Sequence, residues 1–391
     1  MKISIISPYL PSLSSGSAVR TYNLLKRLAQ KNDVTLFCGS YLNSDKEQVD
    51  FIKNIHKKTY FFSYPNFTLS DRIKYYLQNK IPYIERLRQS DFNNLLQYIP
   101  HDTDAIHIAE FQAYSVVEPY LDKLPGKKVL DAHNVDYLRL KSEFDSSPLL
   151  RKVAGYPLVN KLKTYEIQAI QKMDYVLTCS QQDKNIYSQY KNDKDIKVIP
   201  NGVDLKILKK DEEKEVNQRV LFMGNLSYSP NAFGIKWYLE NVHPILVKDN
   251  NDYQIVIIGM NPPQWMKQLS DKDSKIVLKG FVDNIQKEIS QAQVCICPIL
   301  SGSGTRLKLL EYMALKKAVV STTQGAEGID VKNELHLLLT DTPHSFADSM
   351  SKLFNNQHLR KTIGVNGFEM VSTYYTWDKI VNRLNIFYKS L

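Results

Sequence analysis

The segment Cys295–Ile329, CICPILSGSGTRLKLLEYMALKKAVVSTTQGAEGI, decides how this chain folds. It begins within a short, branched apolar run, Val294–Leu300, which predicts a buried strand. Four small residues interrupt that run, and Thr305–Lys316 then has the apolar spacing of a helix. A second apolar run, Ala318–Ser321, follows. Strand, glycine loop, helix and strand form one unit of a parallel, doubly wound α/β sheet.

The glycine loop has the features of a phosphate site. Gly302 and Gly304 let the backbone approach a ligand, and the helix start offers unpaired N–H groups. Arg306 and Lys308 add two cations, and the carboxylate of Glu311 could accept hydrogen bonds from a ribose. The alternative is an ordinary strand-to-helix turn whose charges are solvated. Glycines, cations and carboxylate together favour a nucleotide site.

The segment Gly302–Ile329 resembles the donor site of the retaining GT-B glycosyltransferases called family 4 or group 1. The resemblance extends over nearly the whole chain. It implies two Rossmann-like, doubly wound domains facing across a cleft, with a C-terminal helix that crosses back to the first domain. Glu311 matches the second of two spaced family glutamates, which binds the ribose. The first, which contacts the donor sugar, falls on Ser303, so loop amides or another side chain would hold the sugar hydroxyls.

Length and composition fit a protein of this kind. A chain of 391 residues suggests two or three domains, and 43% hydrophobic with 24% charged residues is typical of soluble globular proteins. No apolar run reaches about 18 residues, and residues 1–10, MKISIISPYL, lack a signal-peptide cleavage site, so we expect a cytoplasmic protein. Cys38, Cys179, Cys295 and Cys297 lie in or beside apolar strand-like runs, which indicates buried, reduced thiols without zinc.

The net charge of +10 has a local source. Residues 51–100 hold eight Lys/Arg against three Asp/Glu, with aromatic residues interleaved. This segment could be a solvated helix face with aromatic core residues, or a surface that rests on anionic lipid headgroups. We expect no nucleic-acid partner, because the chain has no recognisable nucleic-acid motif. The aromatic residues are Tyr60, Phe61, Phe62, Tyr64, Phe67, Tyr75, Tyr76 and Tyr83.

Residues 1–205 are predicted to form the first, acceptor domain. A strand at Ile3–Ile6 leads through a Ser- and Pro-rich loop to a helix at Ala18–Gln30. The resemblance places Gly16, at the end of that loop, near the donor phosphate and sugar. Arg20, one helical turn further on, could face the cleft or the solvent.

Two further residues of this domain follow predicted strands. His133 lies just past a strand at Lys128–Leu130, in the region where open parallel sheets bind ligands. A single histidine is more often satisfied by its neighbours, but the match of DAHNVDY to the family's histidine implies contact with the donor sugar near the reaction centre. Glu110 follows the strand Ala105–Ala109 and could line an acceptor cleft. Asp102-Thr103-Asp104 is interpreted as a strand-entry turn rather than a metal site.

Residues 206–218 read as a charged linker and residues 219–373 as the donor domain, with the final helix at 374–391 returning to the first domain. The loop after the strand Val220–Met223 lacks the arginine and lysine that many relatives use for the diphosphate. Arg306 and Lys308 could replace them, with neutral hydrogen bonds from the loop. We therefore predict His133, Arg306 and Lys308 as catalytic residues, and Gly16, Asn225, Ser227, Gly302, Ser303, Gly304, Thr305, Glu311 and Glu327 as donor-binding residues.

The resemblance implies a retaining, hexosyltransferase-type enzyme that moves a sugar from a nucleotide-diphosphate sugar to a glycan or lipid-linked acceptor, in bacterial surface polysaccharide synthesis. We expect no metal and no cofactor, because the departing diphosphate can take the acceptor's proton and fixed cations can stabilise its charge. The protein would be cytoplasmic, or peripheral on the inner face of the cell membrane. Two alternatives are a nucleotide-sugar epimerase of the same architecture and a non-catalytic paralogue that binds a partner or scaffolds a complex.

Overall fold

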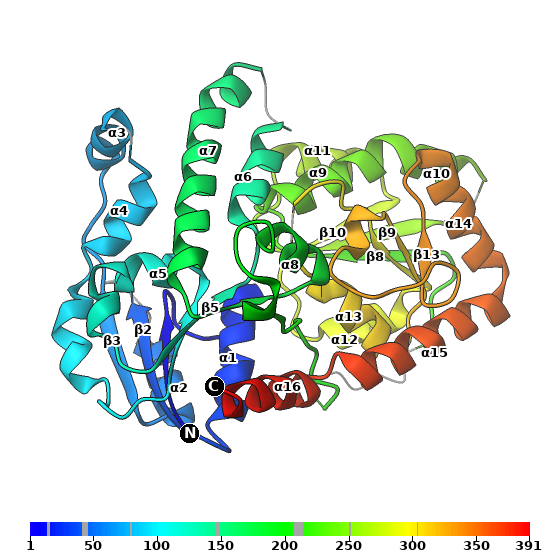
Figure 1. The fold of residues 1–391 in the computed structure, drawn as a ribbon. Coiled ribbons are helices and arrows are strands. Elements are labelled where there is room, and N and C mark those ends of the chain that lie inside the picture. Colours follow the sequence, from blue (N-terminus) through cyan, green and yellow to red (C-terminus); the bar gives the residue numbers. More distant parts are fainter. Residues whose placement is uncertain are drawn as a thin grey trace. The chain divides into compact units, whose positions relative to one another are not determined.

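The computed structural model describes residues 1–13, 16–40, 46–78, 80–145, 149–206, 214–249, 252–302 and 304–391. Contacts divide the chain into two compact units. Met1–Asn201 and Trp377–Leu391 form the first unit, and Gly202–Thr376 forms the second. Each unit is built around one parallel sheet with helices packed about it (Figure 1).

The first unit has a seven-stranded parallel sheet in the order β3-β2-β1-β4-β5-β6-β7. Its strands are β1 (Lys2–Ser7), β2 (Asp33–Ser40), β3 (Thr59–Ser63), β4 (Ala105–Ala109), β5 (Lys127–Ala132), β6 (Tyr175–Thr178) and β7 (Ile196–Val198). Its helices are α1 (Gly16–Leu28), α2 (Lys46–Ile55), α3 (Leu69–Leu77), α4 (Pro82–Arg88), α5 (Glu110–Val117), α6 (Asp136–Asp145), α7 (Leu149–Lys172), α8 (Gln181–Tyr187) and α16 (Trp377–Lys389). Short 3-10 turns are η1 (Asp91–Tyr98), η2 (Glu118–Lys123) and η3 (Asp193–Asp195).

The second unit has a six-stranded parallel sheet in the order β10-β9-β8-β11-β12-β13. Its strands are β8 (Arg219–Met223), β9 (Gln254–Ile258), β10 (Ile276–Lys279), β11 (Val294–Cys297), β12 (Val319–Ser321) and β13 (Leu338–Leu339). Its helices are α9 (Ser229–Trp237), α10 (His243–Asp249), α11 (Gln264–Lys272), α12 (Ile285–Gln291), α13 (Leu307–Ala314), α14 (Pro343–Asn355) and α15 (Gln357–Tyr374), with the π-turn η4 (Tyr238–Val242) and the 3-10 turn η5 (Gln324–Ala326).

Both sheets have the topology of a doubly wound Rossmann-like fold. The strand order reverses beside the first strand of each sheet, between β1 and β4 and between β8 and β11. Such sheets bind ligands outside the carboxyl ends of their strands, at the point of reversal. The predicted fold class is therefore confirmed, and it locates the edge of each sheet at which a site is expected.

The last helix, α16, returns to the first unit as predicted. It lies beside α1 in Figure 1 and shares an apolar cluster with that helix and with β1. Trp377 and Leu384 are buried in this cluster with Leu24 and Leu25 of α1. Burying large side chains of this kind stabilises the fold by about 1.5–3 kcal/mol each.

Three predicted helix boundaries were wrong. The predicted helix Lys161–Gln171 begins earlier, at Leu149, and continues through Pro157. The predicted helix Thr305–Lys316 is shorter, because Arg306 has an extended backbone and Lys316 has a φ of +58°, outside the helical region. The final predicted helix is divided, since Tyr374 ends α15 and α16 begins at Trp377.

The composition raised three questions that the structure addresses in its described part. The four cysteines are buried and not joined in disulfides, as expected. Among the described residues, no group of three or more His, Cys, Asp or Glu side chains is arranged to hold a metal ion. No helix in this part of the chain combines the length and the apolar composition that a membrane span requires.

The amino-terminal end of the second unit is fixed by buried charges, which leads to a first prediction. The carboxylate of Glu215, whose side chain is 36% exposed, lies 2.7 Å from the buried ammonium of Lys317 and 3.3 Å from Nε of Arg360. Glu215→Ala leaves the Lys317 ammonium buried without its counter-ion, so the free energy of unfolding should fall by about 1–3 kcal/mol in denaturant titrations. The control is Glu240→Ala, which removes an exposed ion pair 3.6 Å from Lys236 and should cost less than about 1 kcal/mol. Equal losses for the two variants would contradict this role of Glu215.

Candidate active site

The predicted site residues follow the carboxyl ends of strands near the reversal point of each sheet. In the first unit Glu110 follows β4 and His133 follows β5. Gly16, predicted to end a loop, is instead the first residue of α1. In the second unit Asn225 and Ser227 follow β8, residues 302–311 follow β11, and Glu327 follows β12.

The glycine loop between β11 and α13 has the backbone that its sequence requires. Gly302 and Gly304 have φ values of +97° and +86°, in the region that favours glycine. A Cβ at Gly302 would also lie 3.2 Å from Cγ of Pro230, in the helix that follows β8. Ser303, which stands where the family has its sugar-contacting glutamate, lies outside the described residues. Thr305 is half-buried just before the helix.

Arg306 holds this loop in place. Its Nη1 donates to the carbonyl oxygen of Gly304 and its Nη2 to that of Gly302, each at 3.0 Å. Nη2 also lies 3.9 Å from the Glu327 carboxylate. Nε2 of Gln324 donates to the same Gly302 carbonyl, at 2.7 Å, and to Glu327. Arg306, Glu327 and the glycines therefore form one connected group, to which Gln324 adds a contact that the sequence did not indicate.

Lys308 is a half-buried cation with unused hydrogen-bond capacity. Its Nζ donates to Oδ1 of Asn231 at 2.8 Å and lies 4.1 Å from the ring centre of Phe222. An ammonium has three N–H donors. Among the described residues, the bond to Asn231 is the hydrogen bond that the Lys308 ammonium donates, so donors remain for a ligand. Burial lowers the pKa of Lys308 to about 8. Gly224 makes room for the ammonium, because a Cβ there would lie 2.8 Å from Nζ. A bound anion would complete this environment.

Glu311 lies one helical turn beyond Lys308 and is half-buried. Burial raises the pKa of its carboxyl group to about 7, and the nearby charge of Lys308 only partly opposes that shift. Within the described residues its carboxylate makes no hydrogen bond or ion pair. A half-buried carboxylate that no protein donor engages is suited to accept hydrogen bonds from ligand hydroxyls.

The polar side chains that follow β8 make hydrogen bonds with one another and with the local backbone. Oδ1 of Asn225 accepts hydrogen bonds from the N–H and the hydroxyl of Ser227, at 3.0 and 2.7 Å. Nδ2 of Asn231 donates to the Asn225 carbonyl at 2.9 Å, and its Oδ1 receives Lys308. The loop is thus connected to Lys308 through Asn231, a residue that sequence analysis missed.

His133 lies between two carboxylates in the first unit. Its Nδ1 is 2.7 Å from Oε1 of Glu110, and its Nε2 is 3.3 Å from Oδ2 of Asp131, without hydrogen-bond alignment. Burial lowers the pKa of His133, but the two carboxylates outweigh burial and raise the pKa to about 9. The two carboxylates therefore favour the protonated form of the imidazole. Glu110 has a φ of +70°, a strained value for a residue with a side chain, and such strain is frequent at functional sites.

Arg20 fixes the other side of Asp131. It faces neither a cleft nor the solvent, because it is buried with all five guanidinium N–H groups occupied. Nε and Nη2 donate to the two oxygens of Asp131 at 2.9 and 2.8 Å. The other donors reach the carbonyls of Ile199 and Pro200 and the side chain of Asn201. Burial raises the pKa of Asp131, but Arg20 and His133 outweigh burial and hold it well below the ordinary value.

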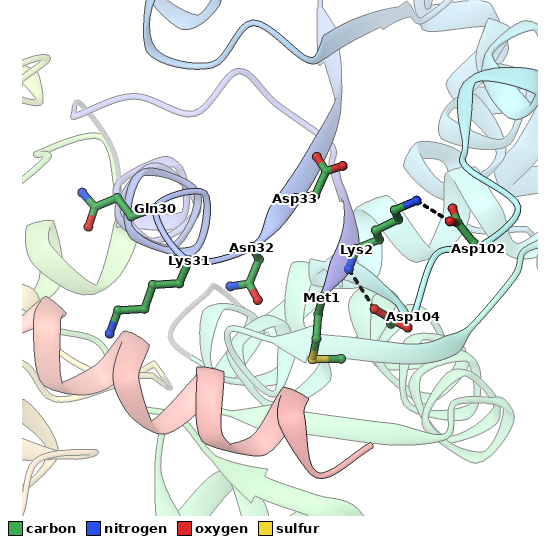
Figure 2. A pocket seen from close by; sticks show the side chains of 8 residues that line it. All are labelled: Met1, Lys2, Gln30, Lys31, Asn32, Asp33, Asp102 and Asp104. Carbon is green, nitrogen blue, oxygen red and sulfur yellow. Dashed lines mark hydrogen bonds and ion pairs between the residues drawn. The ribbon is translucent and has the colours of Figure 1, made fainter.

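A hollow lies at the opposite edge of the first sheet, where β1 begins, and Figure 2 shows it from close by. Nζ of Lys2 forms an ion pair with Asp102. The backbone N–H of Lys2 donates a hydrogen bond to Oδ2 of Asp104 at 2.8 Å. These charges neutralise one another at the amino ends of the strands, so the hollow does not compete with the carboxyl edge as a nucleotide site. Its lining residues are Met1, Lys2, Gln30, Lys31, Asn32, Asp33, Asp102 and Asp104.

Comparison with known proteins supports the family resemblance that the sequence shows. Residues 14–207 match the model described as Glycosyltransferase Family 4, and residues 217–356 match Glycosyl transferases group 1. An uncharacterized protein in the cps region of Klebsiella pneumoniae is 24% identical, with 90% of each chain covered. An uncharacterized glycosyltransferase of Methanocaldococcus jannaschii is 25% identical, over 66% of this chain and 67% of that one.

Solved structures of glycosyltransferases share the fold. HepE of Anabaena in complex with UDP has a TM-score of 0.71 at 14% identity, with each chain fully covered. The same protein in complex with UDP-glucose has a TM-score of 0.69 at 16% identity, with the same coverage. These structures show the shared fold, and the two matches to family models show that the chain belongs to the group 1 glycosyltransferases, glycosyltransferase family 4.

Proposed function

We propose that this chain transfers a hexose, with retention of configuration, from a nucleotide-diphosphate sugar to a glycan or lipid-linked acceptor. The observation that carries the donor part is Lys308, a half-buried ammonium with unused donors at the carboxyl edge of the second sheet. A diphosphate would supply the missing acceptors and raise the pKa of Lys308 again. The Glu311 carboxylate, one turn further on, would accept the ribose hydroxyls.

The same groups would assist departure of the nucleoside diphosphate. Negative charge collects on the diphosphate as the bond to the sugar breaks, and Lys308, Arg306 and the amides of the glycine loop would stabilise it. The departing phosphate oxygen can take the proton of the acceptor hydroxyl, so no separate base is needed. His133 would act as a fixed cation of the first unit rather than as a base, because its two ring nitrogens face the carboxylates of Glu110 and Asp131. We propose that the reaction needs no metal, which addition of a chelator to an activity assay would test.

The proposed acceptor places the enzyme in bacterial surface polysaccharide synthesis, peripheral on the cytoplasmic face of the membrane. The relative from the cps region of Klebsiella pneumoniae supports this assignment. The first nucleotide ligands to test are UDP and the donor UDP-glucose, because a structural relative was solved with each of them. An acceptor screen would follow, with the anomeric configuration of the product read by NMR to test retention.

Calorimetric titration of the purified protein with UDP tests the donor site. Lys308→Met should weaken binding by about tenfold or more, because it removes a charge-assisted hydrogen bond to phosphate. Glu311→Gln should weaken binding of UDP but leave binding of inorganic pyrophosphate unchanged, since the ribose is missing from that ligand. The matched control is Lys236→Met, an exposed lysine of the same unit. Unchanged binding after Lys308→Met would reject the proposed donor site, and absence of binding by every nucleoside diphosphate would favour a non-catalytic paralogue.

A further inference from the structure

Helix α3 exposes an apolar stripe to solvent. The helix buries none of its residues, and Leu69, Ile73 and Leu77 are 71, 53 and 78% exposed. These three residues are spaced by four, so they lie on one side of the helix. An amphipathic helix of a globular protein normally turns such a side towards the core. In Figure 1, α3 lies on the far side of α4 from the strands of the first unit.

The opposite side of α3 determines this orientation. Tyr75 stacks on Phe67 with ring centres 6.1 Å apart. Thr68 and Asp71 form a capping box, in which each side chain accepts a hydrogen bond from the backbone of the other. The helix is therefore begun by its own cap and held by its aromatic and polar side, which leaves the apolar stripe facing outwards.

The charges around the stripe are mainly positive. Arg72 and Lys74 lie in the helix and Lys80 follows it, whereas Asp71 is engaged in the cap. Lys80 shares the carboxylate of Glu85, at 3.3 Å. A second copy of α3 would be repelled, because the charges around the apolar stripe have the same sign on both copies. An anionic lipid surface is complementary to it, and each added Lys or Arg near such a surface increases binding about fivefold.

A second exposed apolar segment points the same way. Leu149 and Val153, in the first turns of α7, are also exposed. In Figure 1 the beginning of α7 and the whole of α3 lie on the same side of the first unit. Two projecting tips with apolar residues are suited to a broad, flat partner rather than to a groove.

We propose that α3 docks the protein on an anionic membrane surface, with Leu69, Ile73 and Leu77 in the acyl boundary and Arg72 and Lys74 on the headgroups. The inference deepens the proposed function and rests on it for its purpose, since it names the surface at which a lipid-linked acceptor would be met. Three aromatic residues of the basic segment are excluded as docking residues. Phe62 and Tyr64 are buried in the core, and Tyr60 stacks on Phe37.

The test is co-sedimentation of the full chain with vesicles of phosphatidylcholine alone or mixed with phosphatidylglycerol, at low and high salt. The wild-type protein should bind the phosphatidylglycerol vesicles at low salt and lose binding at high salt. The affinity of the double variant Ile73→Glu/Leu77→Glu for these vesicles should be at least about tenfold lower, because two apolar side chains are replaced by negative charges. Its melting temperature should match that of the wild type, since both side chains are exposed. The matched control Val365→Glu/Ile386→Glu changes two exposed apolar helical residues elsewhere and should bind normally.

Three outcomes would overturn the inference. These are no binding of the wild type to anionic vesicles at low salt, equal binding by the stripe variant, and an oligomer that the stripe variant dissociates without any vesicle binding. UDP titration of the same preparations separates this inference from the proposed function. Absence of vesicle binding by the wild type, with UDP binding retained, rejects the docking surface alone, and vesicle binding without nucleotide binding rejects the donor site alone.

Discussion

Replacing Arg20 with methionine is expected to lower the free energy of unfolding of the first unit by about 3–5 kcal/mol. The guanidinium donates to both oxygens of Asp131 and to three further acceptors that join α1 to the segment after β7. Methionine fills a similar volume but leaves the Asp131 carboxylate buried with much less compensation and the carbonyls without donors. The loss should be measured by denaturant unfolding in a Trp237→Phe/Trp265→Phe background. There Trp377, buried in the first unit, is the remaining fluorescent reporter.

Two controls separate a buried charge from a general effect of losing a cation. Lys141→Met removes an ion pair to Asp145 that is largely exposed, and it should cost less than about 1 kcal/mol. Adding Asp131→Asn to Arg20→Met should recover part of the loss, because the uncompensated charge is then removed. If Arg20→Met costs no more than Lys141→Met, the Arg20–Asp131 pair does not hold the first unit together.

Much of the fold could be predicted because parallel strands buried on both sides are continuous apolar runs. Strands begin at or beside the predicted first residues Ile3, Val34, Ala105, Lys128 and Val294. Helix ends were harder, since they depend on single backbone angles. The φ of +58° at Lys316 stops α13 without a glycine to signal it. Pro157 in α7 is the opposite case, a residue that usually breaks a helix but lies within one.

The candidate site could be predicted in its chemistry but not in its contacts. The glycines and cations of the β11–α13 loop are adjacent in sequence, so their association was visible. Asn231 is 77 residues from Lys308 and Asp131 is 111 from Arg20, and no local pattern joins them. The partial burial of the charged side chains could not be predicted from the sequence either. Lys308 and Glu311 read as ordinary surface charges of a helix, whereas burial shifts the pKa of each towards neutrality.

Unfolding free energy should depend on the charge of His133 between pH 6.5 and about 9. The group's pKa is 6.5 when unfolded and is raised to about 9 in the folded protein, where Asp131 and Glu110 face it. A raised pKa adds stability that is fully present below pH 6.5 and is lost as the pH rises through 9. The total change corresponds to about 3 kcal/mol, which makes it the second-largest effect expected here.

The measurement is the unfolding free energy of the wild type minus that of His133→Asn, at several pH values from 6 to 10. Taking the difference removes other groups that titrate in this range, such as Lys308. The difference should be largest below pH 6.5 and decline as the pH approaches about 9. The matched control is His101→Asn, which changes an exposed histidine of the same unit. A flat difference for His133 would show a neutral imidazole, and a neutral imidazole could accept the acceptor's proton. A declining difference leaves His133 as a cation that cannot take a proton, which is consistent with the proposal that the proton goes to the departing diphosphate.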